Sequence, residues 1–222
     1  MVASLITKKL TPAGALLGGL VAMGLYAGCG FTGIALLGTF FFLGIAATRY
    51  KQEWKEAEGI SKERERMRTA GQVFANGGLA GMLGSLVVLF PQHAALLQTM
   101  IAACLASATA DTISSELGVV YGRRFYNIRN LKRDARGLDG VISLEGTVLG
   151  LCGSIVVALV YAIGFGINTN IIWIIVAGTL GNLADSLLGA TLERRHLLGN
   201  NAVNFFNTAC AAFAAAALFS LA

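Results

Sequence analysis

The most constraining feature of this chain is a pair of acidic motifs inside long apolar stretches. Asp111 and Glu116 fall in the first motif, and Asp185 falls in the second. An ionisable side chain at the centre of a bilayer costs at least ~2.5 kcal/mol, so it normally faces a polar cavity or a partner group. Carboxylates at these positions therefore mark a candidate functional site within the bilayer.

Composition and run lengths predict an all-α, polytopic membrane bundle. The chain has 222 residues, of which 55% are hydrophobic and 13% are charged. Each apolar run is long enough to cross roughly 30 Å of hydrocarbon. The seven predicted spans are 11–27, 31–48, 70–90, 94–119, 146–166, 171–192 and 201–221. We expect a single membrane domain over 1–222, with an N-terminal helix pair (1–48), a charged loop (49–69) and a core (70–222).

The cations predict the orientation. With seven spans, all 17 Lys and Arg residues fall on one side, before the first span and in segments 49–69, 121–145 and 193–200. The positive-inside rule then places the N-terminus in the cytoplasm and the C-terminus outside. The net charge of +5 is thus a topological signal. No basic patch is interleaved with aromatic residues, so nucleic-acid binding is not expected.

An internal repeat is one interpretation of the core. Residues 81–88 match residues 150–157, and the Ala-Asp pair ending at Asp111 recurs at Asp185. A parallel duplication would place the two aspartates equivalently, although glycine-rich helices also match by chance. The depth argument is independent: both aspartates lie roughly 14 Å along a helix from its cytoplasmic end.

Oxygen ligands on two helices suit Mg²⁺, which takes one or two carboxylates and shares its remaining positions with waters and phosphates. The predicted metal ligands are Asp111, Glu116 and Asp185. The polar side chains expected beside them are Ser115, Asn182, Ser186 and Glu193. A buried polar network that only locks the helices together is the alternative interpretation.

Asparagines supply a second set of candidates. Asn76 ends a polar line that enters the third span from the cytoplasm, and the last span begins with Asn200, Asn201 and Asn204. These amides are candidate donors to phosphate or nucleotide oxygens. Capping and bridging of helices would explain them equally.

The loop 121–145 combines cations with glycines. Its candidate phosphate-binding residues are Arg123, Arg133, Arg136, Gly140, Ser143 and Glu145. Exposed N–H groups and a helix dipole favour anions at such a helix start. Topology alone would explain the charge but not the glycines. The loop 49–69 alternates in sign, which predicts a solvated helical extension.

Five stretches carry a family resemblance: residues 72–78, 110–118, 139–150, 181–193 and 200–205. They resemble an integral membrane family known as domain of unknown function ninety-two or transmembrane protein nineteen. That family includes phytyl-phosphate kinases. The resemblance implies phosphotransfer from a nucleoside triphosphate to a lipid monophosphate.

The favoured hypothesis is an isoprenyl or phytyl monophosphate kinase that uses CTP or ATP and opens to the cytoplasm. The carboxylates would hold Mg²⁺, the asparagines would donate hydrogen bonds, and an arginine of the 121–145 loop would neutralise developing charge. An ion- or proton-coupled transporter is the alternative, in which the same carboxylates relay cations. A purely structural assembly factor is a third interpretation.

Overall fold

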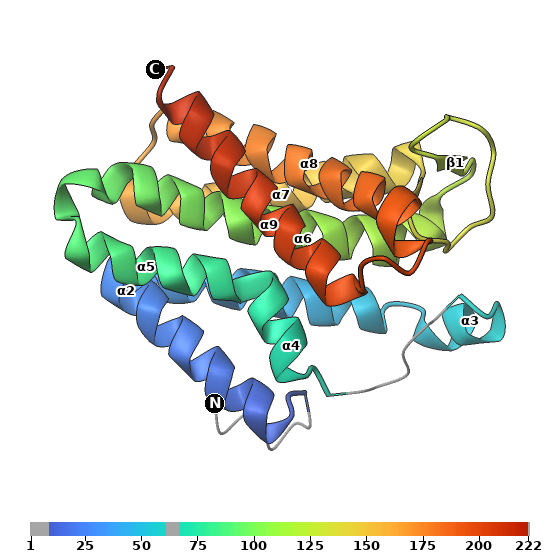
Figure 1. Cartoon of the computed structure of the whole chain (residues 1–222), viewed down its shortest axis with the longest axis horizontal. Helices are drawn as coiled ribbons and strands as arrows, with labels where there is room; N and C mark the ends of the chain where they lie inside the picture. Colours follow the sequence, from blue (N-terminus) through green and yellow to red (C-terminus); the bar gives the residue numbers. More distant parts are fainter. Residues whose placement is uncertain (1–8, 61–66, 222) are drawn as a thin grey trace.

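Helices build almost all of this computed structural model, which describes residues 9–60 and 67–221 (Figure 1). The helical elements are α2 (Pro12–Arg49), α3 (Gln52–Ala57), α4 (Ala70–Val73), η1 (Phe74–Gly78), α5 (Leu79–Leu89), η2 (Pro91–His93), α6 (Ala94–Tyr121), α7 (Leu144–Phe165), α8 (Asn170–Leu188), η3 (Gly189–Glu193) and α9 (Asn200–Phe219). Two short strands, β1 (Tyr126–Asn127) and β2 (Val141–Ile142), pair antiparallel in the loop after α6. The predicted all-α bundle is confirmed.

In the described part of the chain, six helices are long and apolar enough to cross a membrane, whereas the sequence predicts seven spans. The difference lies in α2, whose backbone leaves the helical region at Gly30 (φ 58°, ψ −144°). A straight helix of 38 residues would be about 57 Å long. Instead both of its ends reach Arg68: the Thr11 amide donates to the Arg68 carbonyl at 3.1 Å, and Gly44 packs against the guanidinium.

The helix α2 therefore folds back at Gly30 into two arms, residues 12–29 and 31–49, as Figure 1 shows. A positive φ is costly for residues with a Cβ, so glycine suits this bend. The arms pack on each other, because a Cβ added at Gly33 would lie 2.9 Å from the carbonyl carbon of Leu25. When each arm is counted, residues 9–60 and 67–221 contain seven apolar helical segments.

The helix α6 occupies the centre of the bundle. It packs against α2, α5, α7, α8 and α9, and every residue from Ile101 to Ala110 is buried. This stretch is apolar or small on all sides, which is the pattern of a helix surrounded by others. The small side chains also let neighbouring backbones approach closely.

The segments that carry the cations contact one another at one end of the bundle. Arg68 pairs through its backbone with Lys9, Lys55 reaches the last turns of α6, and Arg194 binds Asp134. This grouping agrees with cations on a single side of the membrane. Which side faces the cytoplasm stays a prediction, and so does the internal repeat.

Candidate functional site

A cavity of about 660 Å³ lies at this charged end of the bundle. It is bounded by the segment before α2, by the end of α2 and the segments that follow it, by α6 and α8, and by the loop between β1 and α7. The predicted site residues that line it are Asn76, Asp111, Ser115, Glu116, Gly140, Ser143, Asn182, Asp185, Ser186, Glu193, Asn200 and Asn204. Residues more than 120 positions apart in the sequence thus meet in one cavity.

Asp111 and Asp185 form the centre of its acidic wall. Asp111 comes from α6 and Asp185 from α8, and their carboxyl groups are close enough to interact directly. Behind them, the Asn207 amide donates to Asp185 at 3.3 Å and accepts from the Ser107 hydroxyl. Two carboxylates this close repel each other unless a proton or a cation lies between them. Both residues line this one cavity, and their role as metal ligands stays a prediction.

Asn182 and Ser114 form a hydrogen bond next to the acidic pair. Asn182 is buried, and its Oδ1 accepts a hydrogen bond of 3.0 Å from the Ser114 hydroxyl. Gly150 of α7 makes room for this contact, because a Cβ there would lie 2.7 Å from the Asn182 amide nitrogen. The packing of three helices therefore fixes the rotamers next to Asp111 and Asp185.

Glu116 forms an ion pair with a lysine and is not part of the acidic pair. Its Oε2 lies 2.6 Å from the Lys55 Nζ, and the Lys55 side chain is only 3% exposed. The same ammonium donates to the carbonyls of Ala47 and Thr48 at 3.0 and 3.3 Å. Within residues 9–60 and 67–221, no three His, Cys, Asp or Glu residues gather as metal ligands. The structure therefore groups Asp111 with Asp185 and leaves Glu116 to Lys55.

Lys55 also changes the interpretation of the 49–69 loop. The sequence predicts a solvated extension there, and a short helix is present as α3. However, α3 inserts its central lysine into the bundle, so this part of the loop is docked rather than solvated. Residues 61–66 of the loop lie outside the described part of the chain.

Four cations line the wall of the cavity: Lys9, Arg49, Lys55 and Arg68. Lys9 precedes α2, Arg49 ends it, Lys55 lies in α3, and Arg68 lies just before α4. Lys9, Arg49 and Lys55 were not expected to contribute to the site, whereas Arg68 begins the polar line that the sequence predicts to end at Asn76. The spacing of Arg68, Gln72 and Asn76 by four residues is the signal that points to Arg68.

The three arginines predicted from the 121–145 loop do not line the cavity. Arg136 binds Glu58 at 2.8 Å and lies over the Trp54 ring. Arg133 and Arg123 are exposed. Glu145 and Asn201 also lie outside the cavity lining. The Glu145 carboxylate instead accepts a backbone hydrogen bond of 3.4 Å from Arg123.

Gly140 and Ser143 shape the loop where it meets the cavity. Gly140 has a φ of 71° and packs so closely on η3 that an added Cβ would lie 2.5 Å from the Ala190 Cα. The Ser143 hydroxyl accepts a hydrogen bond of 3.1 Å from the Gly146 amide and caps α7. These contacts explain the glycine and the serine structurally, while both residues remain in the cavity lining.

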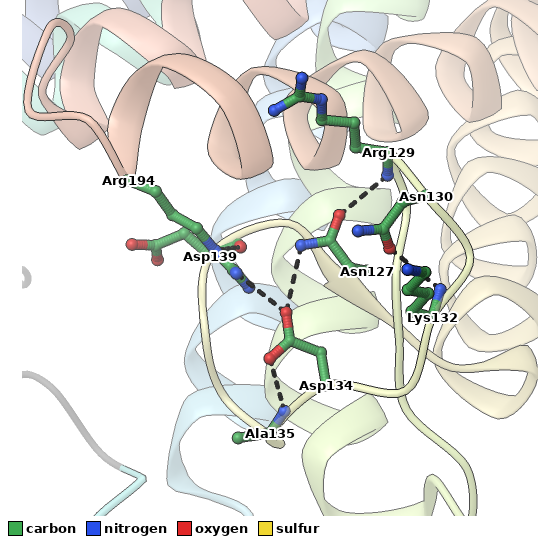
Figure 2. A network of polar contacts seen from close by, with 8 residues as sticks. All are labelled: Asn127, Arg129, Asn130, Lys132, Asp134, Ala135, Asp139 and Arg194. Atoms are coloured by element: carbon green, nitrogen blue, oxygen red, sulfur yellow. Dashed lines mark hydrogen bonds and ion pairs between the residues drawn. The ribbon is translucent and has the colours of Figure 1, made fainter.

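A polar network anchors this loop to the end of η3 (Figure 2). The Asp134 carboxylate accepts hydrogen bonds from the Asn127 amide at 3.1 Å, from its neighbour's backbone and from Arg194 at 2.8 Å. Arg194 also donates to the Asp139 carbonyl at 2.6 Å. The Asn127 hydrogen bond, followed by the Ala135 amide and Arg194, holds the pKa of Asp134 below its usual value.

Two π-helical turns interrupt the helices at the level of the cavity. Asn76 lies in η1, between α4 and α5, and Glu193 ends η3, after α8. π-turns are rare and frequently occur at functional sites, because the extra residue re-aims nearby side chains. Sequence periodicity does not reveal them, since their composition resembles that of the flanking helix.

The fold and this cavity define a multi-pass integral membrane protein with a cavity bearing charges of both signs. The chain belongs to the family of integral membrane proteins DUF92, whose family model matches residues 1–212. This match confirms the resemblance and extends it over the N-terminal helix pair.

Two microbial relatives match most of the chain. An uncharacterized membrane protein of Methanocaldococcus jannaschii, MJ0933, is 36% identical over 81% of this chain and 73% of its own length. The uncharacterized membrane protein sll0875 of Synechocystis is 30% identical over 90% of this chain and 79% of its own length.

A plant relative, the chloroplastic protein VTE6 of Arabidopsis thaliana, is 30% identical over 80% of this chain. The match spans 56% of the plant protein's length. No solved structure matches the chain.

Proposed function

We propose that the protein is a membrane phosphotransferase that converts an isoprenyl or phytyl monophosphate to the diphosphate, with CTP or ATP as the donor. The observation that carries the proposal is the acidic pair Asp111–Asp185 in a cavity that four cations also line. Membership of a family that includes phytyl-phosphate kinases supports the substrate class.

The acidic pair fits Mg²⁺ as a partner. Mg²⁺ accepts one or two protein carboxylates and completes its shell with waters and substrate phosphates. Asp111 and Asp185 would hold it, and the bound ion would neutralise charge on the donor phosphates. Glu116, paired with Lys55, is not needed in that shell. The Ser114 and Asn182 contacts keep the backbone around the pair in place.

In the reaction, an oxygen of the lipid phosphate attacks the terminal phosphorus of the nucleoside triphosphate. The bond between that phosphorus and the bridging oxygen breaks, and a nucleoside diphosphate leaves. Such a transfer needs mainly positioning and electrostatic stabilisation. The chain supplies cations for the two substrates at Arg49 and Arg68, and amide donors at Asn76 and Asn204, all in the cavity lining.

The test is incubation of the purified protein with CTP, ATP, Mg²⁺ and a panel of isoprenyl monophosphates, with mass spectrometry for diphosphates. Asp111→Asn and Asp185→Asn should lower the rate on the order of a thousandfold, because each removes charge from a metal–phosphate contact. Both variants should remain folded, since neutralising a buried acid removes a desolvation cost.

Asp134→Asn is the matched control, because it makes the same chemical change at an acid outside the cavity lining. It should keep wild-type turnover. Full activity of both cavity variants would remove Asp111 and Asp185 from the mechanism. Cation uptake by wild-type vesicles without any diphosphate product would instead support the transporter alternative.

A further inference from the structure

Arg68 is held rigidly at the edge of the cavity. Its amide donates to the Lys9 carbonyl at 2.9 Å, and its carbonyl accepts from the Thr11 amide at 3.1 Å. The backbone is thus clamped to the start of α2, while the side chain reaches the second arm of the same helix. There the guanidinium carbon lies 5.4 Å from the centre of the Phe40 ring.

The lack of a side chain at Gly44 leaves room for the Arg68 guanidinium. A Cβ at Gly44 would lie 3.0 Å from the Arg68 Nη2 and 3.6 Å from the Thr112 methyl group. Because Thr112 adjoins Asp111 on α6, the guanidinium lies at about the depth of the acidic pair. An alanine at position 44 would force the guanidinium to shift by a few tenths of an ångström, and a larger side chain would displace it further.

The N–H groups of Arg68 remain available to a ligand. Among the residues that the structure describes, no carboxylate forms an ion pair with this guanidinium. The Phe40 ring interacts with the cation but offers no oxygen acceptor. A guanidinium has five N–H donors in a planar fork that matches two phosphate oxygens at once. Its position in the cavity lining therefore favours an anion with phosphate geometry.

The distribution of charge distinguishes the two phosphates of a transfer reaction. A triphosphate that carries a metal can approach Asp111 and Asp185, whereas a bare phosphate monoester would be repelled by them. The monoester needs a protein cation, and the Arg68 side chain packs against the second arm of α2, which also contributes Phe41 and Ile45 to the cavity lining. Those two apolar side chains, four positions apart on one helix face, suit a hydrocarbon chain.

We propose that Arg68 binds the phosphate of the lipid acceptor directly, and that Gly44 is the positioning residue that keeps the guanidinium in place. This inference rests on the proposed function for the identity of the acceptor. The shared chemistry is a terminal, dianionic phosphate group. Its possible sources are a lipid monophosphate, inorganic phosphate and the nucleotide.

The test measures binding without turnover, by titration calorimetry in detergent. Wild type should bind phytyl monophosphate, bind inorganic phosphate more weakly and fail to bind phytol. Arg68→Gln should weaken phytyl monophosphate binding about 10- to 100-fold, because charge-assisted hydrogen bonds are lost. Binding of the Mg²⁺–nucleotide should change less than about threefold. Arg124→Gln, at an exposed arginine outside the cavity lining, is the matched control.

Gly44→Ala tests the same contact with the charge intact. It should raise the KM for phytyl monophosphate and leave the KM for the nucleotide unchanged. Gly38→Ala is its control, since a Cβ there meets only Phe42, at 4.0 Å. This variant decides the question if Arg68→Gln does not fold.

Unchanged lipid phosphate binding in both variants would overturn the proposal, as would an equal loss of nucleotide binding or equal affinity for inorganic phosphate. If wild type binds phytyl monophosphate through Arg68 yet forms no diphosphate, the role of Arg68 stands and the kinase function fails. The two failures are therefore distinguishable.

Discussion

Gly140 is the residue at which a single added methyl group should most disturb the edge of the cavity. Its φ of 71° lies in the left-handed region, and a Cβ would overlap the backbone of Ala190 in η3. The left-handed conformation costs roughly 1–2 kcal/mol for a residue with a Cβ. Overpacking against a fixed backbone adds about 1–3 kcal/mol. Gly140→Ala should therefore destabilise the fold by about 2–5 kcal/mol.

Gly59→Ala separates these two contributions. Gly59 also has a positive φ, 67°, but a Cβ added there would have no neighbour within 4 Å among the described residues. Only the conformational cost applies, so the expected loss is roughly 1–2 kcal/mol. With about 2–4 °C per kcal/mol for a chain of this size, the melting temperature should fall on the order of 10 °C for Gly140→Ala. For Gly59→Ala it should fall on the order of 4 °C.

Tryptophan fluorescence during heating in detergent gives the readout. The chain has two tryptophans, and Trp54 packs on Arg136, close to the loop that contains Gly140. Trp173→Phe leaves Trp54 as the only reporter and removes a buried N–H that has no hydrogen-bond partner in the described part of the chain. Equal melting temperatures for Gly140→Ala and Gly59→Ala would refute the claim that the contact with η3 requires glycine.

Three further outcomes are expected. Gly84→Ala should destabilise the protein by about 1–3 kcal/mol in thermal unfolding, because its Cβ would lie 2.6 Å from a carbonyl carbon of α2, whereas Gly38→Ala should be near neutral. Hydrogen bonds depress the pKa of Asp134, so the stability that this carboxylate contributes should be complete above the ordinary pKa of 3.8 and be lost as the pH falls further. A difference in melting temperature between wild type and Asp134→Asn that grows on acidification would contradict this. In a cysteine-free background, Asn130→Cys should react with an impermeant reagent only from the cytoplasmic side and Asn168→Cys only from the other side, so labelling of both from one side would refute the seven-segment topology.

Much of the fold follows from the sequence because the bilayer limits the choices. Backbone polar groups in hydrocarbon must be satisfied within a helix, so long apolar runs predict the spans closely. The cost of ionisable groups in lipid likewise predicts that Asp111 and Asp185 face a common polar cavity. Both inferences use the solvent as a constraint and need no knowledge of which helices are neighbours.

Tertiary structure alone decided how the charges are paired. The sequence could not reveal that Lys55 enters the bundle to bind Glu116, because a short mixed-charge helix has the same composition whether solvated or docked. Nor could it show that Lys9, Arg49 and Lys55 line the cavity while Arg136 binds Glu58 instead. Pairing depends on distances of a few ångströms between segments far apart in the chain, and those distances follow from the bend at Gly30 and the packing on α6.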